Sequence, residues 1–133
     1  MFGRRTLAMG ALLGTLLPGL AGAQDKPLKL GVLTDMSGPF ATLVGENSVE
    51  AARMAVEDAG GVVAGRKIEV LAGDTLNKAD VAANLARRWL DVEGVDVLVD
   101  VPVSLVALAV QAVAKEKKKV VLFSSALTDR LSN

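Results

Sequence analysis

The segment Val95-Asp96-Val97-Leu98-Val99-Asp100-Val101-Pro102-Val103-Ser104 predicts a buried strand that runs into a helix. Valine and leucine make up most of it before the proline, and so short an apolar run is typical of a strand covered on both faces. Pro102 should end the strand, and Ser104 stands at the expected N-cap of a helix that begins with Leu105. We therefore expect a serine hydroxyl and the free N–H groups of a helix start at the carboxyl end of a central strand. Open parallel sheets bind small ligands at such places.

Further apolar runs on either side of this segment predict an alternation of strands and helices. Strands are expected at residues 28–34, 68–72 and 120–123, and helices at residues 45–59, from 77 to about 92, and from 105 to 115. Trp89 lies at helical spacing from Val81 and Leu85, so it should pack on the sheet. Strict alternation indicates an α/β fold, namely an open parallel sheet in the order 2-1-3-4 with helices on both faces.

This strand order brings three serine-bearing loops to one crevice, at residues 35–40, 101–104 and 124–128. Hydroxyls and backbone N–H groups recognise a carboxylate without a cationic side chain. Any one of these serines could form only a turn or a cap, and their convergence is what favours binding. The predicted ligand-binding residues are Ser37, Val103, Ser104, Ser125, Ala126 and Thr128.

Composition argues against several classes of chemistry. The chain of 133 residues has no cysteine and no histidine, so thiolate chemistry, disulfides and the commonest general base are absent. The G-x-S-x-G, G-x-x-x-x-G-K and G-x-G-x-x-G motifs of hydrolases and nucleotide-binding proteins are also missing. Equal numbers of basic and acidic residues give no reason to expect nucleic acid as a partner. We predict a protein that is not an enzyme and needs no cofactor.

Two alternatives remain open from the residues alone. One is a small exported α/β enzyme. The other is a receiver-like module, because Asp35, Asp74 and Asp100 all fall near strand carboxyl ends and could together hold Mg²⁺.

The N-terminus has the pattern of a secretory signal peptide over residues 1–23. Arg4 and Arg5 precede an apolar stretch, and Ala21-Gly22-Ala23 is an A-x-A cleavage site. The apolar stretch contains glycines and a proline and is shorter than the roughly 20 residues that a membrane span needs. We expect cleavage near Ala23-Gln24, export to the periplasm and a mature domain of residues 24–133.

Three stretches of the sequence, taken together, resemble the start of a periplasmic solute-binding protein of the branched-chain amino-acid type. They are LKLGVLTDMSGPFATLVGENSVEAARMAVEDAGG (28–61), KIEVLAGDTLNKADVAANLARRWLDVEGVDVLVDVPVS (67–104) and AVAKEKKKVVLFSSA (112–126). The resemblance implies the first lobe of a type I periplasmic binding protein fold. It also implies a binding component of an ABC importer that takes an amino acid or related small carboxylate and, in its full-length form, meets a membrane permease.

The same resemblance assigns roles to individual residues. Ser104 matches the first-lobe serine that holds the ligand carboxylate, and Ser125-Ala126-Leu127 matches the run that binds the ammonium and carboxylate groups. The family often has serine or threonine where Leu127 stands, and here Thr128 follows one residue later. Family members are several times longer, so the chain is expected to be an incomplete first lobe.

Overall fold

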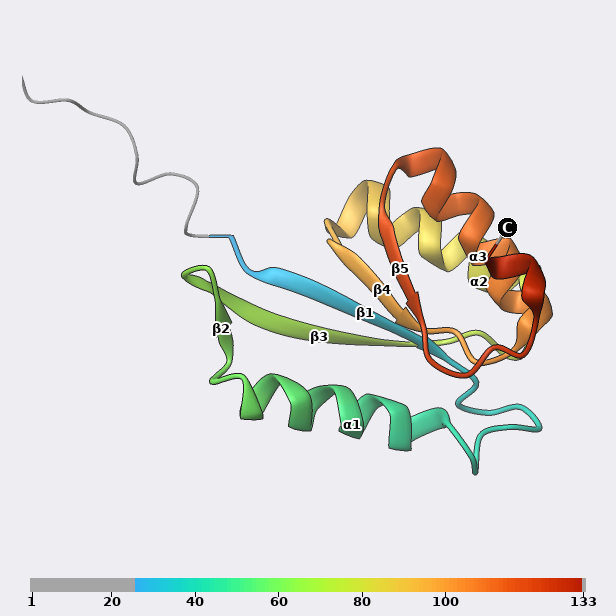
Figure 1. Cartoon of the computed structure of the whole chain (residues 1–133), viewed down its shortest axis with the longest axis horizontal. Coiled ribbons are helices and arrows are strands. Elements are labelled where there is room, and N and C mark those ends of the chain that lie inside the picture. Colours follow the sequence, from blue (N-terminus) through green and yellow to red (C-terminus); the bar gives the residue numbers. More distant parts are fainter. Residues whose placement is uncertain (1–25, 133) are drawn as a thin grey trace, which may run out of the picture.

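A twisted five-stranded sheet forms the centre of the computed structural model, which describes residues 26–132 (Figure 1). The predicted signal peptide, residues 1–23, lies outside the described residues. The strands are β1 (Leu28–Thr34), β2 (Val62–Val63), β3 (Arg66–Asp74), β4 (Val97–Asp100) and β5 (Val120–Phe123). The helices are α1 (Gly45–Asp58), α2 (Ala79–Arg88) with a π-helical turn (Trp89–Glu93), α3 (Ser104–Lys117) and a 3-10 turn (Asp129–Leu131).

The strand order β2-β3-β1-β4-β5 confirms the predicted α/β architecture. β1 pairs in parallel with β3 and β4, and β4 pairs in parallel with β5, which is the expected 2-1-3-4 order of the long strands. The short β2 is an addition, antiparallel to β3, with Val63 opposite Arg66. Ala64 and Gly65 turn this hairpin with positive φ angles of 50° and 78°. Two residues are too few to show an alternating pattern, so this strand was not predicted.

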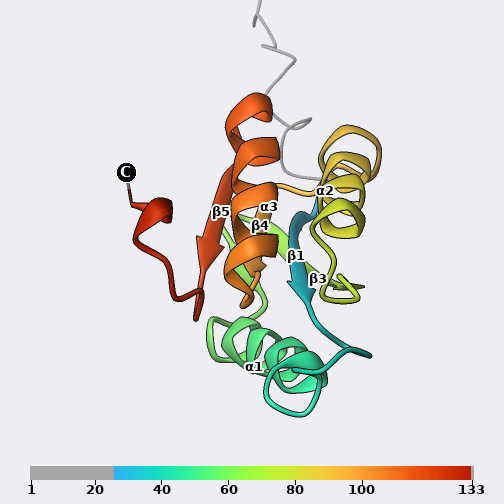
Figure 2. The same ribbon diagram turned by 90° about the vertical axis from the view of Figure 1, so that its right-hand side faces the viewer.

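Helices cover both faces of the sheet, as predicted (Figures 1 and 2). α1 lies along one face against β1 and β3, whereas α2 and α3 pack side by side on the other. The core is concentrated on the α2 and α3 side, where Leu33, Leu98 and Val110 are fully buried. Val121 and Phe123 of β5 also pack there, so the alternating Val120 and Leu122 face the opposite side and are exposed.

Trp89 packs on the sheet, as its spacing predicted. Its side chain is 3% exposed and lies over Gly31 of β1 and Gly73 of β3. A Cβ atom at Gly31 would lie 2.5 Å from the indole Cε3, and one at Gly73 would lie 2.7 Å from Cη2. The two glycines therefore make the space that the indole ring occupies.

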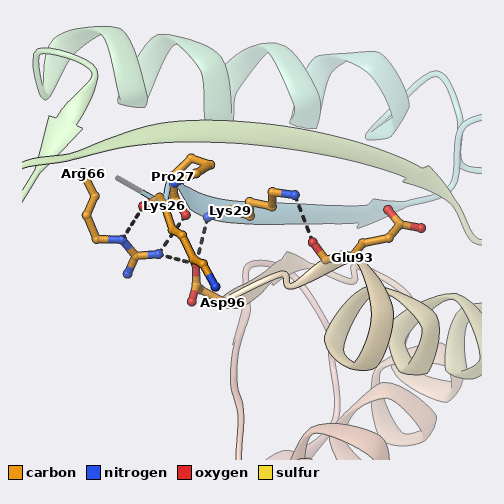
Figure 3. A network of polar contacts seen from close by, with 6 residues as sticks. All are labelled: Lys26, Pro27, Lys29, Arg66, Glu93 and Asp96. Carbon is orange, nitrogen blue, oxygen red and sulfur yellow. Dashed lines mark hydrogen bonds and ion pairs between the residues drawn. The ribbon is translucent and has the colours of Figure 1, made fainter. Parts of the chain in front are cut away.

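The amino ends of the strands are joined by Arg66 (Figure 3). Its guanidinium donates hydrogen bonds to the carbonyl oxygens of Lys26 and Pro27 (2.9 and 2.8 Å) and to Oδ2 of Asp96 (3.0 Å). The same Asp96 oxygen accepts from the backbone N–H of Lys29 at 3.0 Å. One side chain of β3 thus ties the start of β1 to the segment that leads into β4.

Two helix starts differ from expectation. α2 begins at Ala79, two residues after the predicted start at Asn77, with Lys78 as its N-cap and without a side-chain capping bond. Asn77 instead adopts a left-handed backbone, with φ of 54°. The helix after Pro102 begins at Ser104 itself, one residue before the predicted start.

Candidate functional site

An open groove of about 500 Å³ lies at the carboxyl ends of β4 and β5. It contains two of the predicted serines among mostly apolar side chains. Its lining residues are Phe40, Leu43, Val44, Pro102, Val103, Ser104, Leu105, Ser125 and Leu127. Several of the apolar members are exposed, Leu127 most of all at 92%. The groove is therefore an apolar surface with a few polar groups, which is the usual character of a small-molecule site.

A left-handed turn after β4 directs the chain into this groove. Asp100 and Val101 have φ angles of 79° and 48°, a conformation that is rare for residues other than glycine and most of all for a β-branched one. The turn is held by hydrogen bonds from Val101 N–H to the Leu33 carbonyl (2.9 Å) and from Ser124 N–H to the Asp100 carbonyl (3.2 Å). Residues held in such strained conformations concentrate at functional sites.

Ser104 is the first residue of α3, and the expectation that it is the N-cap is wrong. Val103 takes that position with an extended backbone (φ −92°, ψ 123°), and its carbonyl accepts the first helical bond from Ala107 at 2.8 Å. No hydrogen bond of the Ser104 hydroxyl is found within residues 26–132, and the side chain lines the groove. The hydroxyl is therefore free of a structural role in the helix start.

Ser125 lines the groove from the β5 side and is linked to a buried carboxyl group. Its Oγ lies 3.4 Å from Oγ of Ser124, and the Ser124 hydroxyl donates to Oδ1 of Asp100. Asp100 is 8% exposed, and its second oxygen, Oδ2, is buried without a hydrogen-bond partner in the described part of the chain. The end of β4 and the loop after β5 thus supply a row of three polar side chains that ends at the groove.

The loop after β1 brings Phe40, Leu43 and Val44 to the same groove. The buried Asp35 carboxylate accepts from the N–H groups of Gly38 and Phe40, each at 2.9 Å, and so folds the loop back on itself. A side chain at Gly38 would overlap that carboxylate. Phe40, Leu43 and Val44 were not predicted as site residues, although Asp35 three residues before Gly38 is a recognisable turn pattern.

Ser37 belongs to the same loop but points to Asp74 at the end of β3. Its hydroxyl donates to Oδ2 of Asp74 at 2.5 Å, and Oδ1 accepts from the N–H groups of Leu76 (2.8 Å) and Met36 (3.0 Å). Burial raises the pKa of Asp74, but the bonds from Ser37, Leu76 and Met36 outweigh it and hold the pKa below the ordinary 3.8. Ser37 is not among the lining residues of the groove.

The last two predicted residues also lie outside the lining. Ala126 packs against the core, and Thr128 caps the 3-10 turn by accepting from the N–H of Arg130 at 3.4 Å. Leu127, between them, does line the groove. The structure thus brings Val103, Ser104 and Ser125 together and leaves Ser37, Ala126 and Thr128 apart, and a ligand role for each of these residues stays a prediction.

The three strand-end aspartates do not form a metal centre. Asp35, Asp74 and Asp100 each have separate partners, and no group of three or more acidic side chains in residues 26–132 is placed to hold a metal ion. Within the same residues, the helices are all too short or too polar to cross a membrane.

Comparison with known proteins gives consistent matches. A family model described as periplasmic binding protein matches residues 27–133. A periplasmic binding protein from Burkholderia mallei shares 47% identity over 81% of this chain, with a TM-score of 0.78. No curated protein matches the sequence.

Two further solved structures carry ligands. A branched-chain amino acid transporter substrate binding protein from Streptococcus pneumoniae, in complex with isoleucine, is 27% identical over 80% of this chain (TM-score 0.73). A solute binding protein of an ABC transporter from Rhodopseudomonas palustris, in complex with 3,4-dihydroxybenzoic acid, is 25% identical over 80% (TM-score 0.73). The chain spans 29% of the length of the Burkholderia and Rhodopseudomonas proteins and 31% of the Streptococcus protein.

Proposed function

Since the chain belongs to the periplasmic binding protein family, we propose that it forms the ligand-facing part of the solute-binding component of an ABC importer. The cargo is an amino acid of the branched-chain type or a related small carboxylate, and the protein carries it without chemical change. Residues 1–23 act as a signal peptide for export to the periplasm, residues 24–133 form the ligand-binding lobe, and the permease of the importer is the partner of the full-length form.

The observation that carries this proposal is the position of Ser104 in the groove. Its unengaged hydroxyl lies beside the first turn of α3, a helix of 14 residues whose first N–H groups have no carbonyl partner in the helix. Hydroxyl and N–H donors at a helix start suit a carboxylate, which the macrodipole also favours. A carboxylate is what isoleucine and 3,4-dihydroxybenzoic acid, the ligands of the two related structures, have in common.

The apolar residues that line the groove support the more specific proposal that the ligand has a branched-chain side chain. Phe40, Leu43 and Leu105 line the groove with exposed apolar surface that an aliphatic side chain would cover. Burial of apolar area contributes roughly 25 cal/mol per Å², so this apolar lining favours a leucine-like ligand over a polar one.

Titration of the isotope-labelled protein with L-leucine, L-isoleucine and 3,4-dihydroxybenzoate, followed by NMR chemical shifts, tests the proposal. Ser104→Ala should weaken binding of all three about ten- to a hundredfold, because it removes a hydrogen bond to a charged group. Its effect on stability should be small, since the hydroxyl makes no capping bond. Ser132→Ala is the control, because that hydroxyl bonds to the Asp129 carbonyl outside the groove lining. Equal affinity of Ser104→Ala and parent would contradict the proposal.

A further inference from the structure

Asp100 is a buried carboxyl group that the proposed carboxylate site does not use. It is more than nine-tenths buried, and its Oδ2 has no hydrogen-bond partner within residues 26–132. It also forms no ion pair with a described lysine or arginine. A buried carboxylate that lacks a counter-charge is costly, so its retention at a groove calls for an explanation.

The connection to the groove runs through Ser124. The Ser124 hydroxyl has a single proton, and it donates that proton to Oδ1 of Asp100. The Ser124 oxygen can then only accept from its neighbour, which makes Ser125 the donor across the 3.4 Å between the two Oγ atoms. The proton of Ser125 therefore points away from the ligand, and its lone pairs face the groove that it lines.

These hydrogen bonds give the two groove serines opposite characters. Ser104 is free to donate and lies at the start of α3, whereas Ser125 is held as an acceptor through its link to the Asp100 carboxyl group. An acceptor of this kind suits an ammonium group and offers nothing to a ligand that has only a carboxylate.

Resting on the proposed function, we propose that Asp100 is a positioning residue: through Ser124 it fixes Ser125 as a hydrogen-bond acceptor and thereby makes the groove prefer ligands that carry an ammonium group. The left-handed turn at Asp100 and Val101 serves this arrangement, because it keeps the carboxyl group within reach of Ser124 at the end of β5.

The test compares L-leucine with 4-methylpentanoate, the same molecule without its amino group, by NMR titration of the labelled protein. The parent should bind leucine more tightly. Asp100→Asn keeps the shape but can present an amide N–H donor to Ser124 in place of an acceptor oxygen, and asparagine tolerates the left-handed backbone at least as well. It should reduce the preference for leucine about tenfold while affinity for 4-methylpentanoate stays within about twofold.

Variants of Ser124 guard against a purely structural effect. Ser124→Ala breaks the link at an exposed side chain and should also reduce the preference, whereas Ser124→Thr keeps the hydroxyl and should retain it. If Asp100→Asn fails to fold, the difference in leucine preference between Ser124→Ala and Ser124→Thr tests the proposal instead.

The outcomes separate this inference from the proposed function. A parent that binds both ligands equally, or an unchanged preference in the folded variants, overturns the role of Asp100 and leaves the binding function standing. A parent that binds neither leucine nor 4-methylpentanoate, nor any amino acid or small carboxylate tried beside them, overturns both.

Discussion

Adding one methyl group at Gly31 tests how closely Trp89 is packed on the sheet. The new Cβ of Gly31→Ala would lie 2.5 Å from Cε3 and 2.6 Å from Cζ3 of the indole, and 3.2 Å from Cδ2 of Leu98. Carbon atoms in good contact are about 3.5–4.0 Å apart, so the ring would have to move by about 1 Å. Overpacking of this kind costs about 1–3 kcal/mol. Alanine also lowers the conformational entropy of the unfolded chain relative to glycine, which stabilises the fold by about 0.4–1 kcal/mol. We expect a net destabilisation of about 1–2 kcal/mol.

Urea unfolding followed by far-ultraviolet circular dichroism measures this change in the free energy of unfolding. The same substitution in a Trp89→Leu background separates the close approach from other effects of alanine in a strand. Trp89→Leu alone should cost about 2 kcal/mol or more, because it leaves a cavity over the sheet. With the ring gone, Gly31→Ala should cost nothing or even stabilise, which gives a coupling energy of at least about 1 kcal/mol.

An equal cost of Gly31→Ala in both backgrounds would refute the reasoning, since the indole would then not be the obstacle. Gly73→Ala provides an independent check from the neighbouring strand. Its Cβ would lie 2.7 Å from Cη2 of the same ring and also 2.7 Å from Cδ2 of Leu85. Trp89→Leu should therefore relieve only part of the cost of Gly73→Ala, so a smaller coupling than at Gly31 is expected.

Two further predictions concern the loop beyond β1 and the sheet edge. The pKa of Asp74 is lower in the folded protein than its ordinary value of 3.8, so above pH 3.8 its hydrogen bonds contribute their full stabilisation to the fold. This stabilisation is lost as the pH falls through the pKa that Asp74 has in the folded protein. Ser37→Ala should therefore raise the pKa of Asp74, as measured by carboxyl-carbon NMR, and an unchanged value would contradict the assigned hydrogen bond. β5 is an edge of the described sheet and exposes Val120 and Leu122, so we expect copies of the chain to associate there. Leu122→Lys, at a 59% exposed site, should reduce this self-association in sedimentation velocity. Val92→Lys, at a 78% exposed site off the sheet, is the control, and equal sedimentation of both variants would exclude β5 as the contact.

The strand order could be predicted because β1, β3 and β4 are each an apolar run followed by a helix, and the apolar run of β5 follows the last of these helices. Parallel strands with right-handed crossovers allow few arrangements, and the usual one is present. The β2 hairpin could not be predicted in the same way, because Val62 and Val63 are exposed and too few to form a pattern.

The start of α3 shows where local sequence signals fail. Ser104 is a good capping residue by type, yet the backbone is already helical at Ser104, one residue before the predicted start at Leu105. The left-handed turn at Asp100 and Val101 sets the path of the chain, and although aspartate tolerates such a backbone, a β-branched valine does not favour it. Hydrogen bonds with Leu33 of β1 and with Ser124 after β5 hold it, and these partners cannot be recognised from the segment itself.

The sequence by itself determined the class of the fold, the order of its long strands and the convergence of Ser104 and Ser125 at one edge. These follow from burial patterns that add up along the chain, and burial depends on residue type more than on fine geometry. Only the tertiary structure decided that Ser37 bonds to Asp74, that Phe40 and Leu43 line the groove, and that Asp100 reaches Ser124. A hydrogen bond forms or fails over a few tenths of an ångström, and such distances are set by the twist and packing of strands far apart in the chain.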